Sequence, residues 1–201
     1  MAKISNDKCK NSKEKSGEII TEFNPPWLEF IPPERFNNHD LYRIVTFFVF
    51  HSPCAQLSAM SHSLIDYGWD SPWRKPQYLQ KKLKNASTNP DLIFSSQTID
   101  DMRQALSNSN LLDDFPLNIE VERIAIYNNK KNQFMSIFYH LRNAFAHGRL
   151  NMFPLENEKD DYIFAFEDVK IGKTKKVTAR MILRKSTLLK WINIIEKGYQ
   201  E

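Results

Sequence analysis

Cysteine is scarce in this 201-residue chain, and long runs of apolar residues are missing from it. The two cysteines, Cys9 and Cys54, have neither the spacing of a metal site nor the density of a secreted disulfide scaffold. The longest apolar run, "IVTFFVF" at 44–50, is far shorter than the roughly 20 residues that a membrane-spanning helix needs. No positively charged leader with an apolar centre opens the sequence. We therefore expect a soluble protein of the reducing cytoplasm with no membrane partner.

The sequence also lacks a strong excess of either charge. It has 28 Lys and Arg residues against 24 Asp and Glu residues, and this net charge of +4 permits an anionic partner without requiring one. The hydrophobic fraction of 41%, with fourteen phenylalanines and four tryptophans, is enough for one sizeable core. One globular domain is therefore expected.

The first part of the chain is unsuited to regular structure. Residues 1–18 are polar and rich in lysine, so they are predicted to form a disordered tail. Residues 19–39 contain two Pro-Pro pairs, which prevent helix formation and favour an extended arm across the domain. The globular domain is expected to occupy residues 40–201.

Apolar residues recur at the helical spacings of three and four along much of residues 40–106. These patterns predict helices at 40–49, 53–67, 77–84 and 99–106, the last of them capped by Thr98. The segment "IEVERIAIY" at 119–127 is ambiguous, because its β-branched residues favour a strand while its neighbours are helical. We interpret it as a helix.

Beyond Gly148 the apolar pattern changes from helical to alternating. "YIFAFEDV" and "VTARMILR", separated by the turn "KIGKTKK", predict a β-hairpin at about 161–184. The second strand is expected to place Val177, Ala179, Met181 and Leu183 on one side. A last helix, capped by Ser186 or Thr187 and ended by Gly198, carries the stripe Leu188, Trp191, Ile192 and Ile195.

The most regular helix ends within "FYHLRNAFAHGRL" at 138–150. Its two faces differ sharply, because one is apolar and the other carries histidine and asparagine where solvated faces usually carry lysine and glutamate. The apolar face holds Phe134, Phe138, Leu141 and Phe145, and the polar face holds Ser136, His140, Asn143 and His147. Arg142 lies on the flank between them, and Gly148 ends the helix. Such a polar face indicates a functional site.

The segment "RNAFAH", with Arg142, Asn143 and His147, resembles the hallmark of the HEPN superfamily. That hallmark is an arginine, a polar residue and a later histidine at the C-terminal end of a bundle helix. "LRNAFAHGRL", followed by a hairpin and a terminal helix, is similar to HEPN proteins of plasmids and bacterial defence loci. The specific match covers about ten residues, and the order of elements from 130 to 198 supports it.

The resemblance implies a mainly α fold: an antiparallel helical bundle with a β-hairpin inserted between the motif helix and the C-terminal helix. It also implies a homodimer in which two Arg/His pairs line one cleft. Many members of the family are metal-independent endoribonucleases, so the resemblance implies RNA as a partner, no cofactor and no metal. A role in phage defence or as a toxin would add an antitoxin or a regulatory partner.

The chemistry of the motif residues agrees with that activity. Cleavage of RNA through its own 2′-hydroxyl needs proton transfer and a cation to stabilise charge on the phosphate oxygens. We assign His147 as the general acid/base, Arg142 as a bidentate phosphate clamp and Asn143 as the residue that orients His147 or the substrate. One helix supplies one such histidine, which leaves a place for a second acid/base group from the partner protomer.

The same residues also allow a different function. An arginine and a histidine at a helix end can simply bind the last carbonyl groups of the helix. A non-catalytic HEPN-like module that binds RNA, a nucleotide or a protein partner is therefore the alternative to the ribonuclease.

Other candidate residues surround the motif or lie apart from it. His140 shares the polar face, but it lies roughly 10 Å along the helix from His147, too far to share one zinc ion. We expect His140 to support the site or to lie at an interface.

Further RNA contacts are predicted at Arg149, Lys173, Lys175 and Lys176, where the alternative for the lysines is a solvated turn. His51 and His62 near Cys54 are interpreted as packing residues and not as a thiol protease.

Overall fold

The computed structural model of the protein describes residues 38–54, 62–69, 76–87, 93–112, 119–130, 132–155, 157–170 and 176–199. The predicted tail at 1–18 and nearly all of the predicted arm at 19–39 lie outside these residues. Residues 55–61 of the helix predicted at 53–67 also lie outside them.

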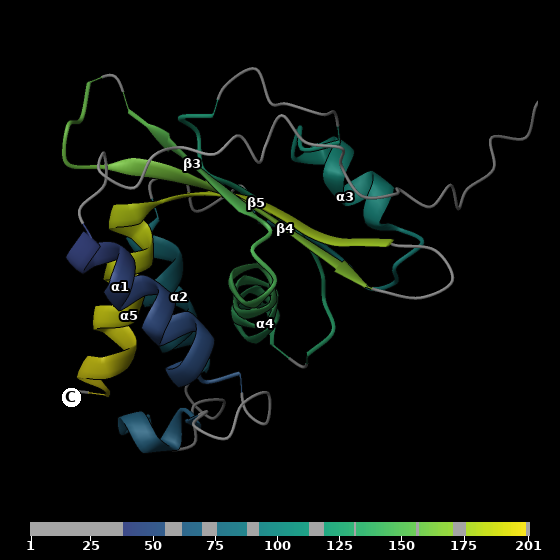
Figure 1. Ribbon diagram of the computed structural model, residues 1–201. Helices are drawn as coiled ribbons and strands as arrows, with labels where there is room; N and C mark the ends of the chain where they lie inside the picture. The colour runs from purple at the N-terminus through teal and green to yellow at the C-terminus, as the bar shows by residue number, and fades with distance from the viewer. Residues whose placement is uncertain are drawn as a thin grey trace, which may run out of the picture.

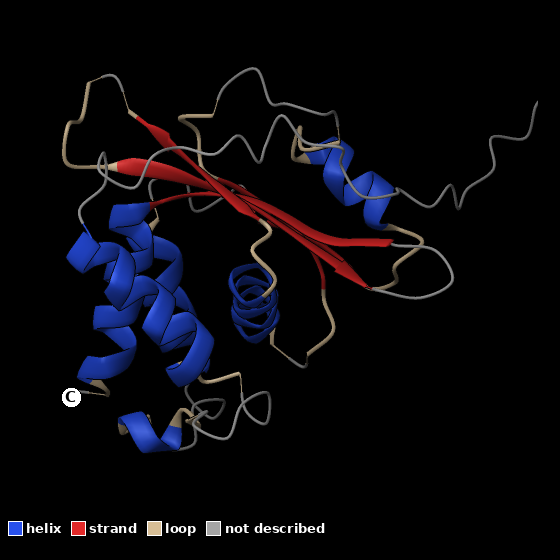
Figure 2. Ribbon diagram, viewed as in Figure 1, coloured by secondary structure: helices blue, strands red, loops and turns tan. Residues whose placement is uncertain are grey.

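In the described part of the chain, five strands form one mixed sheet (Figures 1 and 2). The sheet order is β1-β2-β5-β4-β3, and only β1 and β2 pair in parallel. The strands are β1 (Ile93–Ser96), β2 (Arg123–Tyr127), β3 (Leu150–Pro154), β4 (Tyr162–Lys170) and β5 (Lys176–Arg184). The fold is therefore α/β, and the prediction of a mainly α helical bundle is wrong.

The error arises chiefly at β2, which the sequence analysis interpreted as a helix. This strand lies between β1 and β5, and Ile124, Ala125 and Ile126 are all buried because helices cover both faces of the sheet. A strand that is buried on both faces shows a continuous apolar run and no alternation. Its β-branched residues were thus the better guide to its conformation than its helical neighbours.

Helices cover both faces of the sheet (Figure 2). The helices α4 and α5 pack against one face, α1 and α2 lie against α5 on the same side, and α3 covers the opposite face. Their bounds are α1 (Asn38–Thr46), α2 (Pro76–Ala86), α3 (Met102–Asn108), α4 (Gln133–Ala146) and α5 (Lys185–Lys197). A π-helical turn (Phe47–His51) continues α1, and a short 3₁₀ helix (Ile65–Tyr67) ends at Gly68.

Most of the predicted helices are confirmed within the described residues, with shifted ends. The helix predicted from residue 99 starts at Met102, and residues 99–101 form a turn that leads into it. The predicted contact of Thr98 is present, because its hydroxyl accepts a hydrogen bond from the backbone N–H of Asp101. The cap of α5 is also different from the prediction. Asp161 accepts from the backbone N–H of Ser186, so a side chain from the segment between β3 and β4 caps this helix.

The larger core cluster lies between the sheet and the helices α1, α2, α4 and α5. The predicted apolar stripes of α4 and α5 are confirmed, since all of their members are buried in this cluster. Trp191 of α5 is fully buried, and its indole N–H donates to the carbonyl oxygen of Leu83 at 2.8 Å. A smaller cluster, built around Leu106 and Leu111, fills the space between α3 and the other face of the sheet. The core therefore fixes α4 firmly against the sheet.

The predicted β-hairpin is confirmed as β4 and β5, but it contains an irregularity. Asp168 pairs with Ala179 and Val169 pairs with Val177, so Thr178 is an extra residue that forms a β-bulge. The bulge resets the alternation along β5. Val177 consequently packs in the smaller cluster, whereas Ala179, Met181 and Leu183 pack in the larger one, and the prediction that all four share one side is wrong for Val177.

The described helices were compared with the length and apolar character of a membrane span. Within the described ranges, none of them combines the length and the apolar character that crossing a bilayer would require.

Candidate functional site

The motif lies at the C-terminal end of α4. Asn132 is the N-cap of this helix. Its side-chain oxygen accepts hydrogen bonds from the backbone N–H groups of Phe134 and Met135 at 2.9 and 3.3 Å. It ends where Gly148 adopts a positive φ of 63° and the Arg149 N–H returns to the carbonyl oxygen of Ala144 at 2.8 Å. The predicted end of the helix at Gly148 is confirmed.

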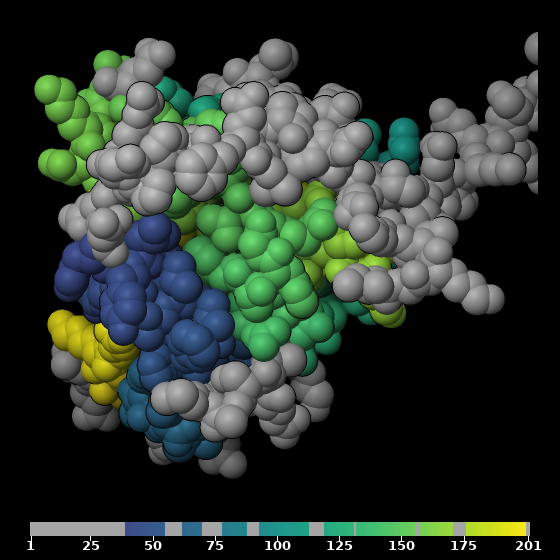
Figure 3. All heavy atoms as spheres, in the orientation of Figure 1, coloured from purple at the N-terminus to yellow at the C-terminus, as the bar shows by residue number. Residues whose placement is uncertain are grey.

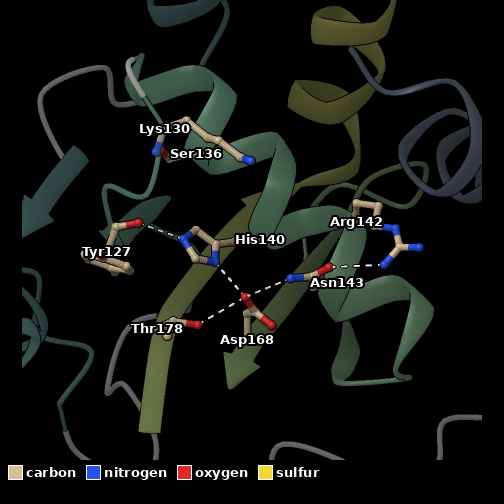
Figure 4. Close-up of polar contacts among 8 residues, drawn as sticks. All are labelled: Tyr127, Lys130, Ser136, His140, Arg142, Asn143, Asp168 and Thr178. Carbon is tan, nitrogen blue, oxygen red and sulfur yellow. Dashed lines mark hydrogen bonds and ion pairs between the residues drawn. The ribbon is translucent and has the colours of Figure 1, made fainter. Parts of the chain in front are cut away.

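Arg142 and Asn143 are in direct contact in the last turns of this helix (Figure 4). The guanidinium Nη1 of Arg142 donates to the side-chain oxygen of Asn143 at 3.2 Å, and both residues are half-buried. The guanidinium is thereby held over the side of the helix that carries Asn143. The structure thus brings together two of the three predicted site residues.

Asn143 is in turn held by the sheet. Its amide nitrogen donates to Asp168 Oδ2 of β4 at 3.3 Å (Figure 4). The same carboxylate oxygen accepts from the Thr178 hydroxyl at 3.1 Å and faces His140 Nδ1 at 2.6 Å. Thr178 reaches Asp168 because the bulge turns this residue toward α4.

His140 lies in the interior beneath the motif. Only 1% of its surface is exposed, so it cannot be the interface residue that the sequence allowed. Its Nε2 lies 2.8 Å from the carbonyl oxygen of Tyr127, and its Nδ1 faces Asp168. A carbonyl oxygen and a carboxylate can only accept hydrogen bonds, so both ring nitrogens must carry protons. This geometry suits a ring that donates from both nitrogens, and His140 and Asp168 lie at ion-pair distance in the interior.

The environment of Asp168 acts on its pKa in two directions. Burial in the interior would raise the pKa of this carboxyl. The hydrogen bond and the charge of His140, together with hydrogen bonds from Asn143 and Thr178, outweigh burial and hold the pKa below its usual value. Asp168 is therefore charged at neutral pH.

His147 lies at the surface, at the C-cap position directly after the last residue of α4. Its side chain is exposed, and its backbone N–H donates to the carbonyl oxygen of Asn143 at 2.9 Å. Residues four apart lie on the same face of a helix, so His147 follows Asn143 along one face by a single turn. Figure 3 shows one face of the molecule, where green atoms from the middle of the chain lie beside the blue atoms of α1.

Arg149, a predicted RNA contact, is engaged with the sheet. Its guanidinium forms an ion pair with Glu167, and Glu167 also pairs with Arg180 at 3.1 Å. Among the lysines of the predicted RNA-binding turn, Lys173 and Lys175 lie outside the described residues. Lys176 forms an ion pair with Asp100 at 3.8 Å.

The histidines near Cys54 form a packed cluster, in agreement with the sequence analysis. The rings of His51 and His62 are stacked 5.4 Å apart, and the ring of Tyr67 packs edge-on against His62. Cys54 is buried, and burial raises the pKa of its thiol. A raised thiol pKa does not suit a nucleophile.

Asp168 and Thr178 are the site residues that sequence reasoning missed. The signal for Asp168 was present in "FAFEDVK", because an acidic pair stands inside an otherwise apolar strand. Thr178 had no such signal, since its orientation depends on the bulge. Among the described residues, no three histidine, cysteine, aspartate or glutamate side chains are placed to hold a metal ion.

The chain matches no protein-family model, no curated protein and no solved structure. The relation to the HEPN superfamily thus remains a resemblance over the motif. Its residues lie at the C-terminal end of a helix, which is where that motif is expected, but the helix packs on a sheet and not in a bundle.

Proposed function

We propose that this protein is a metal-independent endoribonuclease whose site lies at the C-terminal end of α4. The observation that carries the proposal is the contact of Arg142 with Asn143, one helical turn before the exposed His147. A cation is thus held near the end of a helix whose C-cap residue can transfer protons. No fixed metal is needed for these two tasks.

Each residue has a distinct task in this reaction. Arg142 binds the oxygens of the scissile phosphate and stabilises the charge that grows on them as the 2′-hydroxyl attacks. Asn143 keeps the guanidinium in place. His147 is exposed, so an RNA strand can reach it, and it transfers a proton to or from the reacting oxygens.

A second acid/base group is required at the other reacting oxygen. His140 cannot supply it, because it is buried and both of its ring nitrogens are engaged. We assign this role to His147 of the partner protomer in a homodimer whose two helix ends share one cleft. The resemblance to defence proteins further supports a cytoplasmic role as a toxin or in phage defence, under the control of an antitoxin or a regulatory partner.

The alternative is a non-catalytic module that binds RNA, a nucleotide or a protein partner at the same helix end. One observation favours it: each chain exposes a single histidine at the motif, and one histidine alone does not complete the reaction. The two functions differ in one measurable property, which is whether RNA is cut.

The decisive experiment incubates the purified protein with mixed RNA in the presence of a chelator. The variants Arg142→Ala and His147→Ala should lose cleavage and remain folded, with a melting temperature within a few degrees of the wild type for the exposed His147. His39→Ala and Arg103→Ala, which replace exposed residues elsewhere, are the matched controls and should cut RNA normally.

Three results would contradict the proposal. Equal activity in all five proteins would indicate a contaminating nuclease. Full activity in His147→Ala alone would remove this residue from the mechanism. Retained RNA binding without any cleavage by the wild type would favour the non-catalytic module.

A further inference from the structure

One carboxylate oxygen collects hydrogen bonds from two elements that pack against β4. His140 and Asn143 approach Asp168 Oδ2 from α4 at 2.6 and 3.3 Å, and the Thr178 hydroxyl approaches it from β5 at 3.1 Å. Asp168 is only 4% exposed, so solvent does not compete for this oxygen. The carboxylate is thereby fixed in both position and charge.

The contacts continue on both sides of this oxygen (Figure 4). On one side, His140 is anchored to the carbonyl oxygen of Tyr127 in β2 at 2.8 Å. On the other side, Asn143 accepts from the guanidinium of Arg142. An unbroken series of polar contacts therefore runs from the end of β2 to the arginine of the motif.

The direction of each hydrogen bond in this series has a consequence for Arg142. A carboxylate only accepts, so the amide of Asn143 must turn its NH₂ group toward Asp168. The amide oxygen then points away from the sheet, and an oxygen is what a guanidinium needs as a partner. If Asp168 lost its charge, the amide could rotate by half a turn and present NH₂ to Arg142, which would break the contact.

The pair of His140 and Asp168 is poorly explained as a source of stability. Burying two charges costs free energy that their attraction often fails to repay, and apolar side chains of similar volume can usually replace such a pair. Both side chains are buried, with 1% of His140 and 4% of Asp168 exposed, so the cost of burying their charges applies to both. A role in orientation accounts for the charges better than a role in stability.

We propose that Asp168 is a positioning residue, with His140 and Thr178 as its supports: it sets the direction of the Asn143 amide and through it the place of the Arg142 guanidinium. This inference rests on the proposed ribonuclease function of the same helix end. Asp168 itself does not touch RNA, and it acts on the reaction only through Asn143.

The test uses variants that separate charge from packing. Asp168→Asn removes the charge with little change of shape, and the double variant His140→Leu/Asp168→Val replaces the pair by apolar groups that a core tolerates. Thr178→Val removes one donor. Thr187→Val is the matched control, because Thr187 is also buried and its hydroxyl has no hydrogen-bond partner among the described residues.

Two readouts are needed, of which the first does not depend on activity. The side-chain NH₂ signals of Asn143 in an amide NMR spectrum, identified by their loss in Asn143→Ala, should be slow to exchange in the wild type and in Thr187→Val. They should shift and exchange faster in Asp168→Asn and in the double variant, with a smaller change in Thr178→Val. The second readout is RNA cleavage, where kcat should fall about 10- to 100-fold in the first two variants while KM changes little.

The outcomes distinguish this proposal from the ribonuclease itself. Unchanged Asn143 signals in a folded Asp168→Asn or double variant would overturn the positioning role, whether or not the protein cuts RNA. A wild type that cuts no RNA would overturn the ribonuclease, and the Asn143 signals would still decide whether Asp168 orients the amide. Changed Asn143 signals with an unchanged kcat would show that the orientation of this amide is irrelevant to cleavage, against the proposal.

Discussion

His140 Nδ1 lies 2.6 Å from Asp168 Oδ2, and the two side chains form a buried ion pair between the motif helix α4 and the strand β4. This pair ties the middle of α4 to β4. It makes the conformation of the motif depend on a titratable group in the interior, which has a measurable consequence for stability.

We expect the protein to lose stability in acid through Asp168. The pKa of this carboxyl is lower in the folded protein than the 3.8 of an unperturbed aspartate, so the unfolded chain binds the proton more readily. Asp168 therefore contributes stability above about pH 4, and this contribution is lost as the pH falls through the lower pKa of the folded state. In Asp168→Asn, the free energy of unfolding in urea should decline less steeply below about pH 4 than in the wild type.

The control for this measurement is Asp100→Asn, which removes a carboxylate from an exposed position. It should keep the acid dependence of the wild type. The same slope in Asp168→Asn and the wild type would contradict the lowered pKa.

A second prediction concerns the opposite face of the sheet. Arg180 is 1% exposed, and it binds Glu167 at 3.1 Å and the carbonyl oxygens of Leu111 and Leu112 at 2.9 and 2.8 Å. Arg180→Met should lower the free energy of unfolding by about 3 kcal/mol, near the lower end for a broken buried pair, because Glu167 keeps Arg149 as a partner.

Arg43→Met is the matched comparison for Arg180. Arg43 pairs with Glu196 at 2.8 Å at the surface, where the two side chains are 38% and 44% exposed. Its loss should cost less than about 1 kcal/mol, as for other exposed ion pairs. Equal losses in the two variants, measured by urea unfolding, would show that burial does not set the strength of the Arg180 contacts.

Elements with a clear local pattern could be predicted from the sequence. The stripe of α4, its end at Gly148, the hairpin and the stripe of α5 all follow from periodicity and turn residues close to one another in the chain. The fold class could not be predicted in this way, since it depends on which strands pair. The strand β1 has four residues, β2 shows no alternation, and the pairing of β2 with β5 joins segments more than fifty residues apart.

The same difference between local patterns and tertiary contacts applies to the site residues. Arg142, Asn143 and His147 lie within six residues of one helix, so a motif could identify them. Asp168 and Thr178 reach this helix only through the sheet and its bulge. Their contribution depends on tertiary contacts that a linear pattern does not contain.

A third prediction tests the lysine turn between β4 and β5. If this turn binds the RNA backbone, replacing Lys173, Lys175 and Lys176 by alanine should weaken binding and reduce the slope of log affinity against log salt by about 2 for single-stranded RNA. The control is a triple variant of exposed lysines on α2 and α5: Lys81, Lys190 and Lys197. An identical slope in both triple variants would leave the turn as ordinary solvated surface.

A fourth prediction concerns assembly. The proposed cleft needs two helix ends, so sedimentation velocity at micromolar concentration should show a dimer. Mixing the wild type with an excess of His147→Ala should lower the activity of the wild type, because a mixed dimer contains only one of the two histidines that the reaction needs. A monomer throughout the concentration range, or a mixture as active as the wild type that it contains, would contradict the shared cleft.

The last prediction follows from the attacking group. In the proposed reaction the neighbouring 2′-hydroxyl attacks the phosphorus and the 5′-oxygen leaves, so the products should carry a 2′,3′-cyclic phosphate and a free 5′-hydroxyl. A substrate with a single 2′-deoxyribose at the scissile position should resist cleavage, and a chelator should have no effect. Because a histidine transfers the proton, the rate should change between about pH 5 and 8. Equal cutting of the deoxy substrate, or a loss of cleavage in chelator that added magnesium restores, would contradict a mechanism based on Arg142 and His147.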